Sequence, residues 1–184
     1  GAQRRAVKEA MRDMMSGRQM NRLLQGDVGS GKTAVAAALV YSAAKNSMQS
    51  ALMAPTEVLA EQHYKTFLKL FEGCSINVEL LTGSDTAAQK RRKKEALKAG
   101  EIDLLIGTHA IIQSDVEFKS LALVITDEQH RFGVEQRNAL GEKGENPHLY
   151  VMSATPIPRT LALIIYGELD ISILDELPPG RQKI

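Results

Sequence analysis

Residues 26–33 read GDVGSGKT and fill every fixed position of the phosphate-binding pattern G-x-x-x-x-G-K-[S/T]. The preceding residues 22–25, RLLQ, predict a short buried strand, and residues 33–40, TAVAAALV, predict an alanine-rich helix. This pattern requires a strand, a glycine-rich loop and a helix in that order. The stretch therefore predicts a nucleoside triphosphate site, with a ligand-free glycine-rich turn as the alternative.

Each residue type in this loop suits a phosphate group. Glycines let the backbone turn tightly and bring its N–H groups close to phosphate oxygens, and the following helix offers its positive N-terminal end. Lys32 adds a charge that can reach the β and γ phosphates, and the Thr33 hydroxyl suits Mg²⁺. The expected nucleotide-binding residues are Gly26, Asp27, Val28, Gly29, Ser30, Gly31, Lys32 and Thr33.

Size and composition indicate one soluble globular domain. The chain has 184 residues, 43% of them hydrophobic and 24% charged, and it lacks an apolar run of the ~20 residues that cross a bilayer. A single cysteine, Cys74, cannot form an internal disulfide, so a reducing, cytoplasmic setting is expected.

The net charge of +1 does not indicate that the chain binds nucleic acid. The basic run at 90–94 could neutralise phosphates, although a solvated helix face is favoured.

Short apolar runs alternate with helical patterns along the whole chain. Strands are predicted at 22–25, 51–54, 78–81, 102–106, 121–125 and 150–152, and helices at 3–15, 33–40, 86–99 and 157–165. A further helix is predicted to follow Thr56, which can cap it, and to continue until Gly73. This alternation predicts an α/β fold with a doubly wound, mainly parallel sheet and helices on both faces. Residues 1–176 are expected to form the domain, and the proline-rich residues 177–184 to begin a linker.

A pair of carboxylates follows the most apolar predicted strand. Residues 121–125, LALVI, run almost directly into Asp127 and Glu128. Doubly wound sheets bind ligands beyond the C-terminal ends of their strands, so Asp127 is placed to hold Mg²⁺ opposite Thr33. Glu128 can orient and deprotonate an attacking water. A site that only stores nucleotide needs no second carboxylate, so the pair favours hydrolysis over the alternative of an exposed turn.

Six sequence blocks are distributed along nearly the whole chain: GDVGSGKT (26–33), APTEVLAEQH (54–63), IGTHAIIQ (106–113), DEQHRFGVEQR (127–137), MSATPIPRTLAL (152–163) and DELPPGR (175–181). Together they resemble the superfamily 2 helicases, and most closely the RecG family of bacterial ATP-dependent DNA helicases. Each block is moderately specific, and their order and spacing over nearly the whole chain make the combination strong. The resemblance implies a RecA-like P-loop NTPase domain.

The resemblance assigns roles around the nucleotide. Gln3 stands where such helicases place a glutamine that reads adenine, which implies ATP. Lys32 and Glu128 take catalytic roles, and His130 is expected to link the hydrolysis site to Ser153 and Thr155. His63, His109 and His148 lack metal-ligand spacing with Cys74, so no zinc site is predicted.

The resemblance also implies contacts with the phosphate backbone of a nucleic acid. The residues concerned are Pro55, Thr56, Thr82, Gly83, Thr108 and His109. Each pair places hydroxyl or backbone N–H groups at a predicted strand end or helix start, which suits phosphate binding without base readout. Taken singly, each pair also fits an ordinary cap or turn.

The RecG resemblance predicts the first motor domain of a DNA helicase that remodels replication forks and recombination intermediates. It implies two partner domains: a second RecA-like domain that supplies an arginine finger, and an N-terminal wedge domain. The domain alone is expected to hydrolyse ATP slowly. The alternatives are a transcription-repair coupling factor motor and a nucleotide-gated binding module. Gln129 and residues 175–181 favour the RecG family over the former, and Glu128 argues against the latter.

Overall fold

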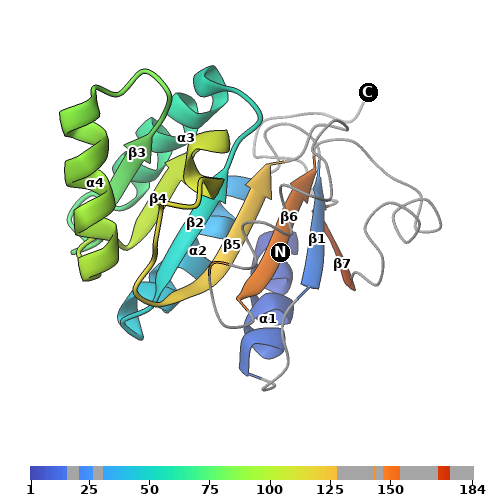
Figure 1. Ribbon diagram of the computed structural model, residues 1–184. Coiled ribbons are helices and arrows are strands. Elements are labelled where there is room, and N and C mark those ends of the chain that lie inside the picture. Colours follow the sequence, from blue (N-terminus) through green and yellow to red (C-terminus); the bar gives the residue numbers. More distant parts are fainter. Residues whose placement is uncertain (16–20, 27–30, 128–142, 144–146, 154–169, 175–184) are drawn as a thin grey trace.

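The computed structural model describes residues 1–15, 21–26, 31–127, 143, 147–153 and 170–174. Within these ranges helices and strands alternate along the chain (Figure 1). The elements are α1 (Ala2–Met15), β1 (Asn21–Gly26), α2 (Lys32–Lys45), β2 (Gln49–Met53), α3 (Glu57–Leu70), β3 (Val78–Leu81), α4 (Ala87–Ala99), β4 (Leu104–Gly107), the 3-10 helix η1 (His109–Ile112), β5 (Leu121–Asp127), β6 (His148–Ser153) and β7 (Asp170–Leu174).

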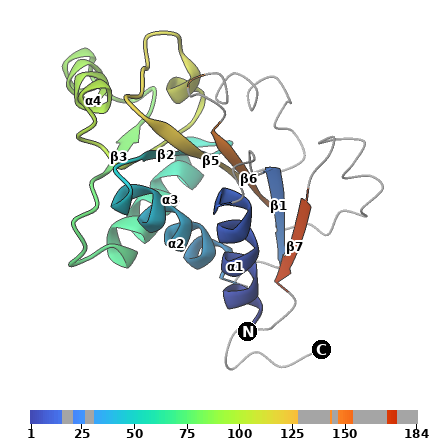
Figure 2. The same cartoon turned by 90° about the horizontal axis from the view of Figure 1, so that it is seen from below.

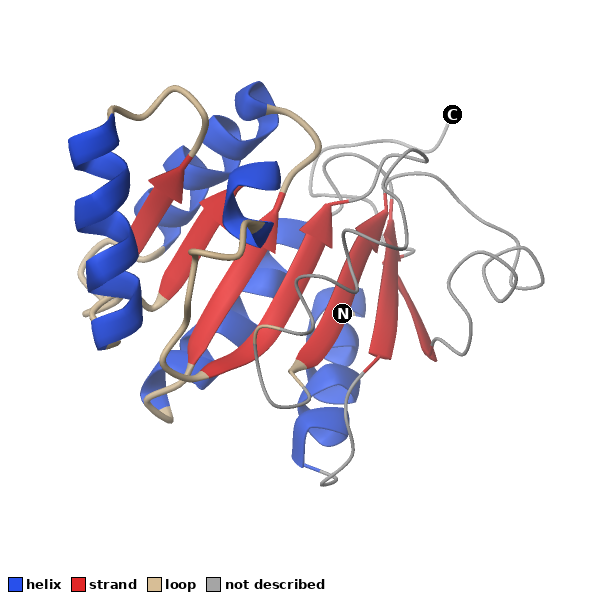
Figure 3. Cartoon of the chain, viewed as in Figure 1, coloured by secondary structure: helices blue, strands red, loops and turns tan. Residues whose placement is uncertain are grey.

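The strands form one seven-stranded sheet in the order β3-β4-β2-β5-β6-β1-β7. Every neighbouring pair in this order is parallel. The C-terminal ends of all the strands therefore lie along one edge, at the top of Figure 3. The segments that follow β1 to β6 in the sequence begin at this edge, where doubly wound sheets bind their ligands.

Helices cover both faces of the sheet, as predicted (Figure 2). On β2, Leu52 packs in a cluster with Leu39 of α2 and Phe67 of α3. The neighbouring residue Met53 packs on the opposite face, with Leu97 of α4. Because both faces are covered, the strands read as nearly continuous apolar runs rather than as alternating ones.

Local side-chain chemistry sets where two of the helices begin. The Thr56 hydroxyl accepts a hydrogen bond from the Leu59 N–H at 3.2 Å, so it caps α3. Thr86 and Gln89 form a reciprocal capping box at the start of α4. The predicted start of the helix after Thr56 is confirmed, and α4 agrees with the prediction to within one residue at its start.

The observed elements differ from the prediction at several places. Strand β7 and the helix η1 were not predicted. The predicted helix at 157–165 lies outside the described residues. Strand β2 begins at the polar residue Gln49 instead of residue 51, and Gln49 is buried. Its side-chain amide donates to the carbonyls of Leu97 and Ile102, both at 2.9 Å, and accepts from the Ser120 N–H at 2.9 Å. These bonds satisfy the buried amide, so a polar residue is stable in the strand.

The buried face of α1 consists mainly of alanines and not of the larger apolar residues of this helix. Helix α1 buries Ala2, Ala6 and Ala10, while Met15 is 82% exposed. Small alanine side chains let this helix pack closely, so its larger apolar residues lie at the margin. Within the described residues, no helix has both the length and the apolar character needed to cross a bilayer.

Candidate functional site

The C-terminal edge of the sheet brings the predicted site residues together in two neighbouring groups. We call strands β5, β6 and β1, with the segments that follow them, the β1 half of the edge. Strands β3, β4 and β2, with the segments that follow them, form the β3 half. The two halves meet where β2 pairs with β5.

In the β1 half, helix α2 starts at the end of the glycine-rich loop. Gly26 is the last residue of β1, and Gly31 is the N-cap residue of α2. The Gly31 carbonyl accepts from the N–H groups of Ala34 at 3.1 Å and Val35 at 3.3 Å. As a glycine, this N-cap residue has no side chain of its own to cap the helix. Lys32 and Thr33 are the first two residues of α2, so they lie at its positive end.

Gln3 lies at the same helix start, although 28 positions separate it from Gly31 in the sequence. A Cβ atom on Gly31 would overlap Gln3 Nε2, and Gly31 has a φ of +88°, which L side chains rarely adopt. Helix α1, which carries Gln3, is held to β1 by ion pairs from Arg22 to Glu9 at 2.9 Å and to Asp13 at 2.8 Å. The fold thus brings the predicted adenine-reading residue against the glycine loop.

Asp127 ends β5, which is separated from β1 by one strand, β6. Its Oδ2 lies 2.7 Å from Nε2 of His63, which is on α3. Because an ionised carboxylate only accepts hydrogen bonds, Nε2 carries the hydrogen. Sequence reasoning missed this contact. The signal available was the position of His63 at the end of the block APTEVLAEQH.

The side chains available for a cation in the β1 half fit Mg²⁺. Thr33 offers a hydroxyl and Asp127 a carboxylate, which are the hard oxygen ligands that Mg²⁺ prefers. In the described ranges, no three His, Cys, Asp or Glu side chains gather into a group that could hold a metal ion. One carboxylate and one hydroxyl fit Mg²⁺, which is usually held by one or two carboxylates and by the phosphates of a substrate.

In the β3 half, three strand ends carry the predicted nucleic-acid residues. Thr56 follows Pro55 after β2; it is an exposed residue whose side chain caps α3. Thr82 and Gly83 follow β3; Thr82 is buried and its N–H donates to Asp85 at 3.3 Å. Thr108 and His109 follow β4, with Thr108 half-buried and His109 exposed. These three segments therefore begin on neighbouring strands in the order β3-β4-β2.

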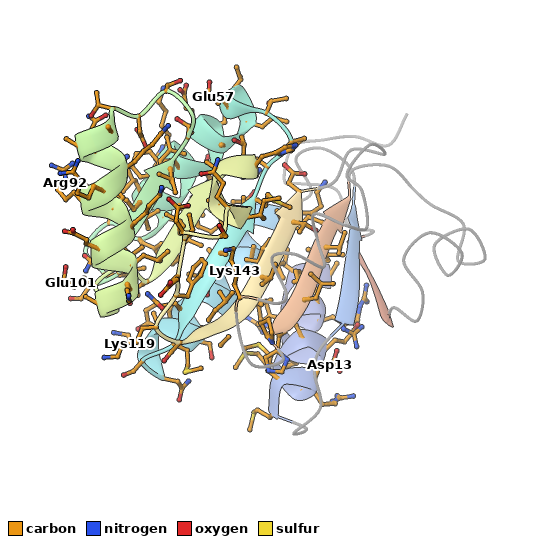
Figure 4. The ribbon with its side chains drawn as sticks, viewed as in Figure 1. Asp13, Glu57, Arg92, Glu101, Lys119 and Lys143 are labelled. Carbon is orange, nitrogen blue, oxygen red and sulfur yellow. The ribbon has the colours of Figure 1, made fainter. Side chains whose placement is uncertain are left out.

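Glu57 joins two of these segments, and sequence reasoning did not single it out. Its Oε1 accepts from the Ser84 hydroxyl at 2.8 Å and from the Ser84 N–H at 3.2 Å. Hydrogen bonds from Ser84 and Thr82 lower the pKa of the Glu57 carboxyl. Glu57 lies at the upper edge in Figure 4, while Asp13 lies near the opposite end of the sheet. The ionised Glu57 thus fixes the loop after β3 beside the start of α3.

Gly107 allows the ends of β3 and β4 to approach closely. A Cβ atom at this position would overlap the carbonyl oxygen of Leu81 and would lie 2.6 Å from Cγ2 of Ile111. The Gly107 carbonyl also accepts from the Ala54 N–H at 2.8 Å. A residue without a side chain is therefore needed directly before Thr108.

The basic run at 90–94 lies on α4, and two of its lysines bond to residues outside this helix. Lys93 Nζ donates to the Leu80 carbonyl at 2.5 Å and to Asp85 at 3.1 Å. Lys94 pairs with Asp115 at 2.5 Å, and its hydrogen bond lowers the pKa of that carboxyl. Arg92 projects outward from α4 in Figure 4. Arg91 and Arg92 are exposed, whereas the Lys93 and Lys94 side chains are only 12% and 21% exposed. The favoured interpretation of the run as a solvated helix face is therefore confirmed only in part.

The remaining predicted site residues lie wholly or partly outside the description. Ser153 ends β6, but only its place in the strand is described. The residues outside the described ranges are Asp27, Val28, Gly29, Ser30, Glu128, His130 and Thr155.

Comparisons with known proteins bear on these arrangements. Residues 2–164 match the model of the DEAD/DEAH box helicase family. The ATP-dependent DNA helicase RecG of Bacillus subtilis (strain 168) is 57% identical over 183 residues, which are 100% of this chain and 27% of the relative. RecG of Aquifex aeolicus (strain VF5) is 58% identical over 185 residues, with 100% and 23% covered.

A solved structure of RecG bound to a three-way DNA junction superposes with a TM-score of 0.85 at 49% identity, covering 100% of this chain and 24% of that chain. The chain thus spans about a quarter of the length of these relatives. The predicted resemblance to RecG and the RecA-like fold are confirmed. Since the helicase model matches most of its length, the chain belongs to the DEAD/DEAH box helicase family.

Proposed function

We propose that this chain is the ATP-binding motor domain of a DNA helicase that remodels branched DNA, such as replication forks and recombination intermediates. One observation carries the proposal. The loop–helix junction at Gly31, Lys32 and Thr33 and the carboxylate of Asp127 lie at the same edge of one parallel sheet. Residues 1–176 form the motor domain, and residues 177–184 begin the linker to a second one.

Residues 26–33 bind the phosphates of ATP. The N–H groups at the start of α2 and the ammonium group of Lys32 meet the phosphate oxygens, and the helix dipole favours the negative charge. Gln3 recognises the adenine base. Its position against Gly31 supports this role, because the base and the phosphates of one nucleotide must be reached from neighbouring residues.

Thr33 and Asp127 hold Mg²⁺, which when bound neutralises the charge of the phosphates. Glu128 orients the attacking water and takes its proton. His130, Ser153 and Thr155 couple this chemistry to movement of the domain. The position of Ser153 at the end of β6, between β5 and β1, supports this assignment.

The β3 half of the edge binds the phosphate backbone of DNA. Pro55 and Thr56, Thr82 and Gly83, and Thr108 and His109 supply hydroxyl and N–H groups from three neighbouring strand ends. Such groups fix the register of a strand without reading its bases. The relative solved on a three-way DNA junction supports DNA as the partner.

Motor activity needs further domains. The chain spans about a quarter of its RecG relatives, and we propose a second RecA-like domain and an N-terminal wedge domain as its partners in the bacterial cytoplasm. The comparisons favour neither alternative, the repair-coupling motor nor the nucleotide-gated module. Without the arginine finger of a second domain, we expect slow hydrolysis.

The test is a chimera in which this chain replaces the matching segment of Bacillus subtilis RecG. We expect the chimera to hydrolyse ATP in the presence of fork DNA and to unwind the fork. Glu128→Gln in the chimera should keep ATP binding and lose hydrolysis. A chimera that folds and binds fork DNA, yet neither binds nor hydrolyses ATP, would contradict the proposal.

A further inference from the structure

The hydrogen bond between His63 and Asp127 is a side-chain contact that crosses the boundary between the two halves of the sheet edge. His63 lies on α3, which follows β2 in the β3 half, and Asp127 ends β5 in the β1 half. Their closest atoms, Nε2 and Oδ2, are 2.7 Å apart. The side chains are only 14% and 24% exposed, so this is a partly buried bond shielded from much of the solvent.

The fold, and not Asp127 alone, orients the imidazole of His63. One turn further along α3 lies Phe67, which is fully buried in the core. The two ring centroids are 6.4 Å apart, with the planes tilted by 44°. The helix itself is fixed at its start by the Thr56 cap and is buried at Ala60. A donor held in this way can impose one orientation on a carboxylate.

The hydrogen bond leaves Asp127 able to bind a cation. Only Oδ2 accepts from His63, and a carboxylate has two oxygens with several lone pairs. Donation of this bond requires only a hydrogen on Nε2 of His63. Hydrogen bonds of this kind to ligating carboxylates set their orientation in metal sites.

We propose that His63 is a positioning residue whose Nε2–H holds the carboxylate of Asp127 in the orientation that binds Mg²⁺ with the nucleotide. This inference rests on the proposed role of Asp127 as a metal ligand. Loss of such an outer hydrogen bond typically weakens metal binding or activity about 10- to 100-fold. His63 itself touches neither metal nor nucleotide in this account.

Two substitutions separate the hydrogen bond from the packing of the ring. His63→Phe keeps an aromatic ring beside Phe67 and removes the donor. His63→Gln loses the ring but keeps an N–H donor of similar reach. For each protein, the affinity for a fluorescent, non-hydrolysable ATP analogue is measured in Mg²⁺ and in EDTA, and thermal unfolding is followed by circular dichroism. The ratio of the two affinities reports the metal alone.

We expect His63→Phe to lower this ratio about tenfold or more, while its affinity in EDTA stays that of the unsubstituted chain. His63→Gln should restore most of the ratio. A ratio unchanged in folded His63→Phe would overturn the inference, and so would a ratio lost equally in both variants. Should His63→Phe not fold, His63→Leu serves as the donor-free variant.

Asp127→Ala separates failure of this inference from failure of the proposed function. If Asp127→Ala lowers the ratio and His63→Phe does not, the metal site stands and His63 does not position it. If the unsubstituted chain binds the analogue equally well in Mg²⁺ and in EDTA, the proposed metal site is wrong, and the role of His63 is wrong with it.

Discussion

The two halves of the sheet edge each place a helix after a strand, but the starts of these helices differ. In the β1 half, the N-cap residue of α2 is Gly31, which has no side chain of its own to cap the helix. In the β3 half, the hydroxyl of Thr56 already accepts the Leu59 N–H of α3. An uncapped helix start can direct its N–H groups at a phosphate, whereas a capped one has satisfied part of them internally. The β1 half therefore suits the concentrated charge of a triphosphate, and the β3 half suits single backbone phosphates.

The halves also differ in how their loops are fixed. In the β3 half, Glu57 holds Ser84, and Gly107 brings β4 against Leu81. In the β1 half, Gln3 approaches from α1, an element that is remote in the sequence. The hydrogen bond from His63 to Asp127 joins the halves. The halves also meet in the pairing of β2 with β5, in the bonds from Lys143 to the Gln113 and Val116 carbonyls, and in the apolar cluster of α2 and α3. A local substitution in one half should therefore affect the other half less than its own.

Lys32→Ala should have the largest effect, and it should be confined to the β1 half. Hydrogen bonds to charged groups contribute about 1.5–3 kcal/mol, so affinity for an ATP analogue should fall roughly 10- to 150-fold. Lys45→Ala, at the other end of the same helix, is the matched control and should bind normally. Calorimetric titration measures both. Equal affinity for Lys32→Ala and the unsubstituted chain would show that α2 does not bind the phosphates.

Gly107→Ala should chiefly disturb the β3 half. Its Cβ would overlap the Leu81 carbonyl and press on Ile111, so the free energy of unfolding should fall by about 1–3 kcal/mol. Gly83→Ala is the control, since its Cβ would meet only Glu57 Oε1, at 4.0 Å. Urea unfolding followed by circular dichroism compares the two. The close approach is not needed if both variants unfold alike.

Thr56→Ala removes the cap of α3 and should cost about 1 kcal/mol of the free energy of unfolding. The control is Thr66→Ala on the same helix, because the Thr66 hydroxyl donates only to the Gln62 carbonyl at an exposed position. Its unfolding free energy should change little. Chemical denaturation measures the free energy of unfolding of both variants. If Thr66→Ala lowered it as much as Thr56→Ala does, the capping role of Thr56 would be contradicted.

The smallest effect is the pH response of Glu57. Hydrogen bonds from Ser84 and Thr82 make the pKa of this carboxyl lower in the folded chain than in the unfolded one. Its contribution to stability is therefore full above the ordinary Glu pKa and is lost as the pH falls through the lowered folded-state pKa. The Ser84 amide resonance, followed by NMR, should titrate below the ordinary Glu range, and Glu57→Gln should abolish this step. A midpoint at or above that range would contradict the contact.

Local sequence patterns predicted most of this fold because apolar runs and caps act within a few residues. The strand before the glycine loop, the buried run at 121–125 and the cap at Thr56 are of this kind. Strand β7 was missed because its place at the sheet edge depends on pairing with β1, which is distant in the sequence. The start of β2 was missed because buried Gln49 is satisfied by residues from three remote segments.

The candidate site shows the same division. GDVGSGKT is contiguous, so its residue types predict a phosphate loop directly. The contacts of Glu57 with Ser84 and of His63 with Asp127 span 27 and 64 positions. No local pattern specifies them, because the packing of α3 against β3 and β4 and the pairing of β2 with β5 bring the partners together. The roles of the predicted site residues stay predictions.

The central claim is that one sheet edge carries a nucleotide site in its β1 half and a nucleic-acid site in its β3 half. Backbone amide NMR of the isotope-labelled chain tests it most directly, by titration with Mg²⁺ and a non-hydrolysable ATP analogue and, separately, with single-stranded DNA. We predict that the nucleotide shifts the amides of Gly31, Lys32, Thr33 and Asp127, and that DNA shifts those of Thr56, Thr82, Gly83 and Thr108. Shifts by DNA and nucleotide on the same half, or competition between them, would contradict the claim.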